Sequence, residues 1–174
     1  MFGDLWTSAN IIEFFEIREI NAEIERFNSV LAKFKFAPLD ASDQSSWFIV
    51  AGVPWSKPQL WPSTDCPGVY VLCAHDEGAP ERVAAYVGKA SLQNMGAEIG
   101  AKLYGSSQRE KGIYTMMDLS GQTFVIEAVI TTGVRDKSMR FLASALEEFI
   151  IDGVQEEING VPRVHLLNGT GVER

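Results

Sequence analysis

Two tyrosines flanked by glycine lie close together in the segment CPGVYVLCAHDEGAPERVAAYVGKAS. Tyr70 ends the run GVY, Tyr86 begins the run YVG, and Lys89 follows the second run directly. A phenol can donate a hydrogen bond to water and, once deprotonated, accept one. Gly68 and Gly88 would leave bare backbone beside the phenols, so the pattern fits either a packed pair of strand tyrosines or a ligand site.

A β-hairpin is expected to carry these tyrosines. Strands are predicted at Val69–Ala74 and Val83–Val87, joined by HDEGAPER, in which Gly78 and Pro80 favour a turn. Successive side chains of a strand point to opposite faces of the sheet. With a compatible register, both phenols would therefore lie on one face.

Helices and further strands are expected around the hairpin. A helical spacing of apolar residues, a run of β-branched residues and the positions of glycine and proline mark them. The predicted helices are Asn10–Lys35, Met95–Tyr104 and Lys137–Ile158; the predicted strands are Trp47–Gly52 and Thr123–Thr132; Pro38–Ser46 is a predicted loop and Pro54–Pro67 an irregular connector.

This order of elements predicts an α+β fold with a small mixed or antiparallel sheet flanked by helices. Residues 1–65 would form an N-terminal amphipathic helix, a strand and a Pro/Trp-rich connector packed on the core of residues 66–174. The apolar seam of the first helix spans fewer than three heptads, so it would either pack within the chain or hold a homodimer or protein partner. The seam consists of Ile17, Ile20, Ile24, Phe27, Leu31 and Phe34.

The charge and composition narrow the classes of function. A net charge of −8 argues against a broad basic surface that wraps nucleic acid. Between Lys89 and Lys111, however, the sequence has four basic residues and two acidic ones, so a polyanion would be expected to bind there. The two cysteines and two histidines do not form a zinc pattern. The chain shows neither a membrane-spanning run nor a signal peptide, so we expect a cytoplasmic protein without a membrane partner.

Four motifs in order resemble the GIY-YIG nuclease family. They are GVY at 68–70, YVG at 86–88 with the continuation YVGKAS, ALEEFII at 145–151 and LLNGTG at 166–171. The resemblance implies a compact sheet flanked by helices and metal-assisted hydrolysis of a phosphodiester bond, with DNA as the substrate. The literal run Gly112-Ile113-Tyr114 is not the motif, because no YIG-like run follows it.

The resemblance also implies roles for individual residues. Glu147 would bind one divalent cation, Mg²⁺ or Mn²⁺, completed by water and phosphate oxygens. Tyr70 is the leading candidate for the base that activates water, with Tyr86 as its partner, although the assignment between them stays open. Asn168 would support the site. Lys89 could pair with a phosphate beside Gly88, or be an ordinary surface lysine.

One departure from the family pattern weakens the inference of activity. The family places an arginine on the helix after the second motif, and this chain has Lys102 in that position, within IGAKLY. Lysine keeps the charge but not the bidentate geometry, and loss of such a donor can cost about 100-fold in rate. Tyr104 could act as a substitute donor, and Arg109 could reach the site from the next loop.

Two hypotheses of different class follow, with a third in reserve. The chain is a metal-dependent endonuclease, or it is a GIY-YIG-like interaction module without catalysis that uses its acidic surface and first helix to hold a protein. An enzyme of unrelated chemistry on the same fold is the remaining reading. Both tyrosines, Glu147 and Asn168 favour the nuclease, whereas Lys102 and the acidic balance favour the module.

Overall fold

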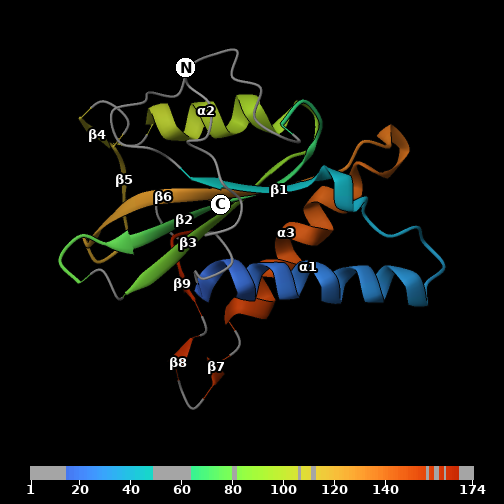
Figure 1. Cartoon of the computed structure of the whole chain (residues 1–174), viewed down its shortest axis with the longest axis horizontal. Helices are drawn as coiled ribbons and strands as arrows, with labels where there is room; N and C mark the ends of the chain where they lie inside the picture. Colours follow the sequence, from blue (N-terminus) through green and yellow to red (C-terminus); the bar gives the residue numbers. More distant parts are fainter. Residues whose placement is uncertain are drawn as a thin grey trace, which may run out of the picture.

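The structure is a computed structural model that describes residues 15–48, 64–79, 82–105, 107–110, 113–155, 157–158, 161–162 and 164–168. Most of the predicted connector Pro54–Pro67 lies outside these residues, as do positions 49–52 of the strand predicted at Trp47–Gly52. The elements, shown in Figure 1, are α1 Phe15–Lys33, β1 Gln44–Phe48, β2 Gly68–Asp76, β3 Val83–Ala90, α2 Met95–Gly105, β4 Ser107–Glu110, β5 Ile113–Met117, β6 Thr123–Gly133, α3 Phe141–Gln155, β7 Glu157–Ile158, β8 Val161–Pro162 and β9 His165–Leu166.

The chain is α+β, with helices on both faces of one mixed sheet. Among the described residues, seven strands form this sheet in the order β4-β5-β6-β2-β3-β9, with β1 also paired to β6. The pairs are antiparallel except for β9, which runs parallel to β3. Strand β2 pairs along one edge of β6. The other edge of β6 is shared by β5 and β1. The sheet is therefore larger than the small sheet predicted from the sequence.

The two faces of the sheet carry separate hydrophobic clusters. Val69, Val71 and Val87 point toward α1 and α3, whereas Tyr70 and Leu72 point toward α2. This division follows from the alternation of side chains along each strand. Figure 1 shows the same layers, with α2 on one side of the strands and α1 and α3 on the other.

Helix α1 packs its apolar seam on α3 within the same chain. Ile20, Ile24, Phe27 and Leu31 are buried, and the rings of Phe27 and Phe149 meet edge to face with centroids 5.3 Å apart. Phe34, the last residue of the predicted seam, is instead 72% exposed, because α1 ends at Lys33. The predicted start at Asn10 lies outside the described residues. The buried part of the seam is not available to hold a second protein.

A glycine lets the two helices approach closely. A methyl group at Gly153 of α3 would lie 2.9 Å from one carboxylate oxygen of Glu23. Glu23 is buried in α1, and its other oxygen lies 3.2 Å from Arg26. The contacts Glu23–Gly153 and Phe27–Phe149 step in opposite directions along the chain, so the helices are antiparallel.

Hydrogen bonds hold the short segment before β2, residues 65–67, in place. Arg135, just after β6, makes two hydrogen bonds to Asp65 and one to Asp43. The carbonyl of Cys66 accepts from Met95 at the start of α2, and Val134 donates to the carbonyl of Pro67. These bonds fix the point at which β2 enters the sheet and the start of α2 beside it.

Several element boundaries differ from the sequence prediction for identifiable reasons. A 3₁₀ turn at Lys137–Met139 precedes α3, capped by the Asp136 side chain, so the helix begins later than predicted. It ends at Gln155, and Glu157–Ile158 pairs with Val161–Pro162 as β7 and β8. The predicted loop Pro38–Ser46 contains a 3₁₀ turn and the start of β1. Within the described residues, no helix is long and apolar enough to span a bilayer.

Replacing Ile24 with alanine tests the packing of α1. We expect the free energy of unfolding to fall by about 2–4 kcal/mol, because a large buried side chain leaves a cavity in a close-packed core. Urea denaturation measures the loss, with Glu25→Ala on the exposed side of α1 as the control. Sedimentation velocity should show the same oligomeric state for all three proteins; unchanged stability with a changed oligomeric state would contradict the packing described.

Candidate functional site

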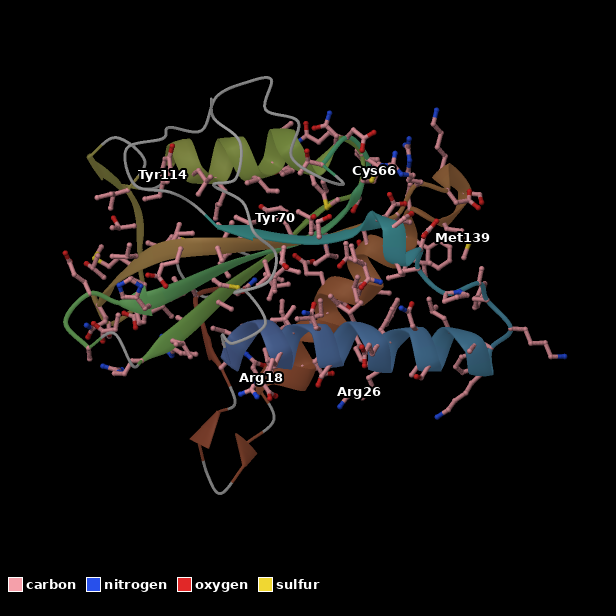
Figure 2. All side chains as sticks on the ribbon, in the orientation of Figure 1. Arg18, Arg26, Cys66, Tyr70, Tyr114 and Met139 are labelled. Atoms are coloured by element: carbon pink, nitrogen blue, oxygen red, sulfur yellow. The ribbon has the colours of Figure 1, made fainter. Side chains whose placement is uncertain are left out.

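Tyr70 and Tyr86 lie on one face of the sheet, beneath α2. Tyr70 is paired with Gly88 across the strands, and Leu72 is paired with Tyr86, so the phenols are diagonal neighbours. Their ring centroids are 6.3 Å apart. Both side chains are buried, Tyr86 less fully than Tyr70. Figure 2 shows the labelled Tyr70 between the sheet and α2.

The two glycines of the motifs make room for the protein's own atoms. A methyl group at Gly88 would lie 2.6 Å from the phenol oxygen of Tyr70, because that ring lies across the backbone of β3. A methyl group at Gly68 would lie 2.8 Å from the sulfur of Met95. Both distances are below van der Waals contact. The side of Gly68 and Gly88 that faces α2 is therefore filled and does not form open backbone for a ligand.

Tyr70 is held as a neutral phenol. Its burial raises its pKa well above the usual value, and the nearby Tyr86, Glu98 and Glu147 add to the shift. A hydrogen bond to Tyr86 further favours the protonated form of Tyr70. A phenol that keeps its proton in this way is a hydrogen-bond donor, so the burial of Tyr70 is an argument for Tyr86 in the choice of base that the sequence left open.

Lys102 reaches the phenol pair from α2. Its ammonium nitrogen lies 4.1 Å from the centre of the Tyr86 ring, in cation–π geometry. Met95, Ile99 and Leu103 are buried under the same helix and fix its position on the sheet. Lys102, which stands in the position of the family's arginine, therefore contacts Tyr86 directly.

Lys89 and Glu147 meet on the other face of β3. Their side chains form an ion pair with a nitrogen–oxygen distance of 2.7 Å. Lys89 alternates with Gly88 along the strand and so points toward α3, where Glu147 is 17% exposed. Glu147 also contributes to the raised pKa of Tyr70, so its charge acts on that phenol from the far side of the strand.

Asn168 holds the chain beside Tyr86. Its side-chain oxygen accepts from the backbone N–H of Val87 at 2.9 Å, and its side-chain nitrogen donates to the carbonyl of Val87 at 2.6 Å. Leu167 donates to the carbonyl of Ala85. The tail thus completes the pairing of β3 at the residue between Tyr86 and Gly88, and the Asn168 amide is used by the backbone of Val87.

Glu98 is a charged group of the site to which the sequence analysis gave no role. It is partly buried on α2, accepts a hydrogen bond from Gln93, and its charge raises the pKa of Tyr70. Its position four residues before Lys102 places the two on one side of the helix, and this spacing was the available signal. The structure describes only the backbone of Tyr104, in α2, and of Arg109, in β4.

Comparison of the chain with models of known protein families, with curated protein sequences and with solved structures found no match. The site must therefore be judged on its own groups. Lys89 and Lys102 balance Glu98 and Glu147, so these four side chains together carry no formal net charge. A negatively charged phosphate would gain little from such a cluster unless another cation joined it.

The carboxylate of Glu147 is the candidate ligand for a divalent cation. The described residues hold no group of three or more His, Cys, Asp and Glu side chains able to enclose a metal. Mg²⁺ is commonly bound by one or two carboxylates together with substrate phosphates, and Glu147 has the exposure for this role. Lys89 already pairs with one Glu147 oxygen, so a cation bound to this carboxylate would lie close to the Lys89 ammonium group.

Alkaline stability should report the buried phenol. The pKa of Tyr70 is raised on folding, so the stability linked to its proton is complete below its unfolded value of about 10 and is lost as the pH rises further. We expect the free energy of unfolding to fall between about pH 10 and 11.5, and to fall less in Tyr70→Phe. Urea denaturation across this range measures both; equal losses would contradict the assignment.

Proposed function

We propose that the chain is a metal-dependent endonuclease of the GIY-YIG type that hydrolyses DNA phosphodiester bonds. The observation that supports it best is the approach of Lys102 to Tyr86 at 4.1 Å, with the Lys89–Glu147 ion pair on the opposite face of β3. Groups from the four motifs of the sequence, far apart along the chain, thus surround one strand. The order of these motifs is what suggests the family.

In this proposal the two phenols have different tasks. Tyr70 keeps its proton and donates to the oxygen of Tyr86, which leaves that oxygen as an acceptor. Tyr86 is also the more exposed of the two. We therefore assign to Tyr86, after its own proton has passed to solvent, the removal of a proton from the attacking water, and to Tyr70 the positioning of Tyr86.

The two lysines would act on the phosphate. Lys102 would leave the face of the Tyr86 ring and donate to a phosphate oxygen as negative charge grows. Lys89 would exchange its Glu147 partner for a second oxygen, freeing the carboxylate. A Mg²⁺ or Mn²⁺ ion on Glu147 would supply positive charge at the phosphate and lower the pKa of a bound water. Asn168 keeps β3 in place during this exchange.

A second candidate function is a binding module without catalysis. Two observations favour it: lysine stands where a bidentate arginine would be expected, and that lysine is packed on Tyr86. The four charged side chains also balance one another. A module of this kind would keep the fold and bind a partner through another surface, since the buried seam of α1 is covered by α3.

The carboxylate of Glu147 provides the first test. Purified protein should nick supercoiled plasmid in the presence of Mg²⁺ or Mn²⁺, and Glu147→Ala should reduce the rate by about 100-fold or more. Glu148→Ala is the matched control, because Glu148 is the exposed neighbour of Glu147 on the same helix. This variant should cut at the wild-type rate. A thermal melt of each variant checks folding. Equal cutting by Glu147→Ala would refute the assignment of the metal ligand.

The charge on α2 provides the second test. Lys102→Arg should raise the single-turnover rate by about tenfold, because a guanidinium can hold two phosphate oxygens at once. Lys102→Gln should lower the rate by about 100-fold while leaving the fold intact. A plasmid-nicking time course measures both. Rates that do not respond to either change would show that this position does not contact the phosphate.

A further inference from the structure

The end of α1 presents two phenylalanines to solvent, alternating with two lysines along the chain. The run Lys33-Phe34-Lys35-Phe36, here called the KFKF tip, follows the buried Leu31. Phe34 is 72% exposed and Phe36 is 45% exposed, and both lysines are exposed. Figure 1 shows that this end of α1 projects past the strands. Two large apolar side chains are thus exposed in the turn that follows α1.

The backbone of the tip is closed in a way that normally uses glycine. Lys35 has a φ of 61°, and it is the non-glycine residue with a positive φ among those described. Lys35 donates to the carbonyl of Ala32 and Phe36 donates to the carbonyl of Leu31, the two bonds of a Schellman motif. A side chain is disfavoured in this conformation. The lysine is therefore present despite a local cost to folding.

The tip is also a basic spot on an acidic chain. No acidic residue occurs between Arg26 and Asp40, although the net charge is −8. The carboxylates that follow are already engaged: Asp40 accepts from Ser42, and Asp43 pairs with Arg135. Lys33 and Lys35 are exposed. Among the described residues neither Lys33 nor Lys35 has an ion-pair partner, so an anionic partner would meet two positive charges next to two aromatic rings.

We propose that the KFKF tip binds single-stranded DNA, with unpaired bases stacked on Phe34 and Phe36 and phosphates held by Lys33 and Lys35. Stacking on aromatic side chains combined with basic groups along the backbone is the usual chemistry of single-strand binding. Paired bases are already stacked within a duplex, so the rings select unpaired segments. The inference rests on the proposed function and names the form of DNA that the enzyme would prefer.

Other occupants fit the tip less well. An anionic membrane surface is bound by an extended amphipathic face, and the apolar face of α1 is buried against α3. A second copy of the chain would need an interface of about 800 Å² on each partner, far more than two rings supply. The tip lies on the same side of the sheet as Glu147, opposite Tyr86 and α2: Phe34 is about 10 Å further along the direction of α1 than Phe27, which contacts Phe149, two residues from Glu147.

Binding can be measured apart from cleavage. Fluorescence anisotropy with a labelled oligo(dT) in EDTA and low salt should show that the double variant Phe34→Ala/Phe36→Ala raises the Kd by about tenfold or more. Lys35→Gly should weaken binding and reduce the slope of log K against log salt by about one, while raising the Tm by about 2 °C as the backbone relaxes. Leu119→Ala, at an exposed apolar residue in the β5–β6 turn, is the control and should bind normally.

The outcomes separate this inference from the proposed function. Oligonucleotide binding that depends on Phe34 but is not accompanied by any nicking would support the tip and reject the nuclease. Unchanged affinity in the double variant would reject the tip, whether or not plasmid is cut. Two other results would also reject single-stranded DNA as the occupant. In the first, Phe34 is needed for binding to phosphatidylserine vesicles but not to the oligonucleotide; in the second, Phe34 is needed only for self-association, measured by sedimentation.

Discussion

The packing of the Tyr70 ring against the backbone of Gly88 is the contact on which the arrangement of the site depends. Because position 88 has no side chain, the phenol of β2 can lie across β3 and still be buried under α2. That burial raises the pKa of Tyr70 and leaves Tyr86 as the phenol nearer the surface. Lys102 then lies over the ring of Tyr86. The absence of a side chain at position 88 thus permits the burial that keeps Tyr70 protonated.

Strand β3 joins two sets of groups because its side chains alternate. Tyr86 faces α2 and Lys89 faces α3, only three residues later, so the lysine that pairs with Glu147 and the phenol under Lys102 share one piece of backbone. β2 holds this strand along one edge, and the Asn168 amide holds Val87 along the other. Any movement of the tail would shift both sets together. The strand is thereby a rigid link between groups on opposite faces.

Local patterns in the sequence predicted the central elements and the shared face of Tyr70 and Tyr86, because alternation and turn residues are local signals. They could not show that the glycines accommodate Tyr70 and Met95, since that depends on packing between strands and α2. β4 and β5 were missed because they are short and gain their pairing from β6. The engagement of Lys89 with Glu147 also needs tertiary structure, as the two residues are remote in sequence. Whether the chain belongs to the GIY-YIG family stays a prediction.

The pairing of the charged groups within the site would weaken the binding of a nucleic acid there. Each cation of the site already has a partner in the free protein, Lys89 with Glu147 and Lys102 with the Tyr86 ring, so a phosphate must replace these contacts as it enters. The net gain from ground-state binding at the site is then small. Binding energy from groups remote from the reacting bond can supply what the site lacks, and it can be directed toward the transition state. An acidic chain with a balanced site therefore requires a separate basic and aromatic surface if it is to hold a polyanion, and exposed Phe34 and Phe36 provide one.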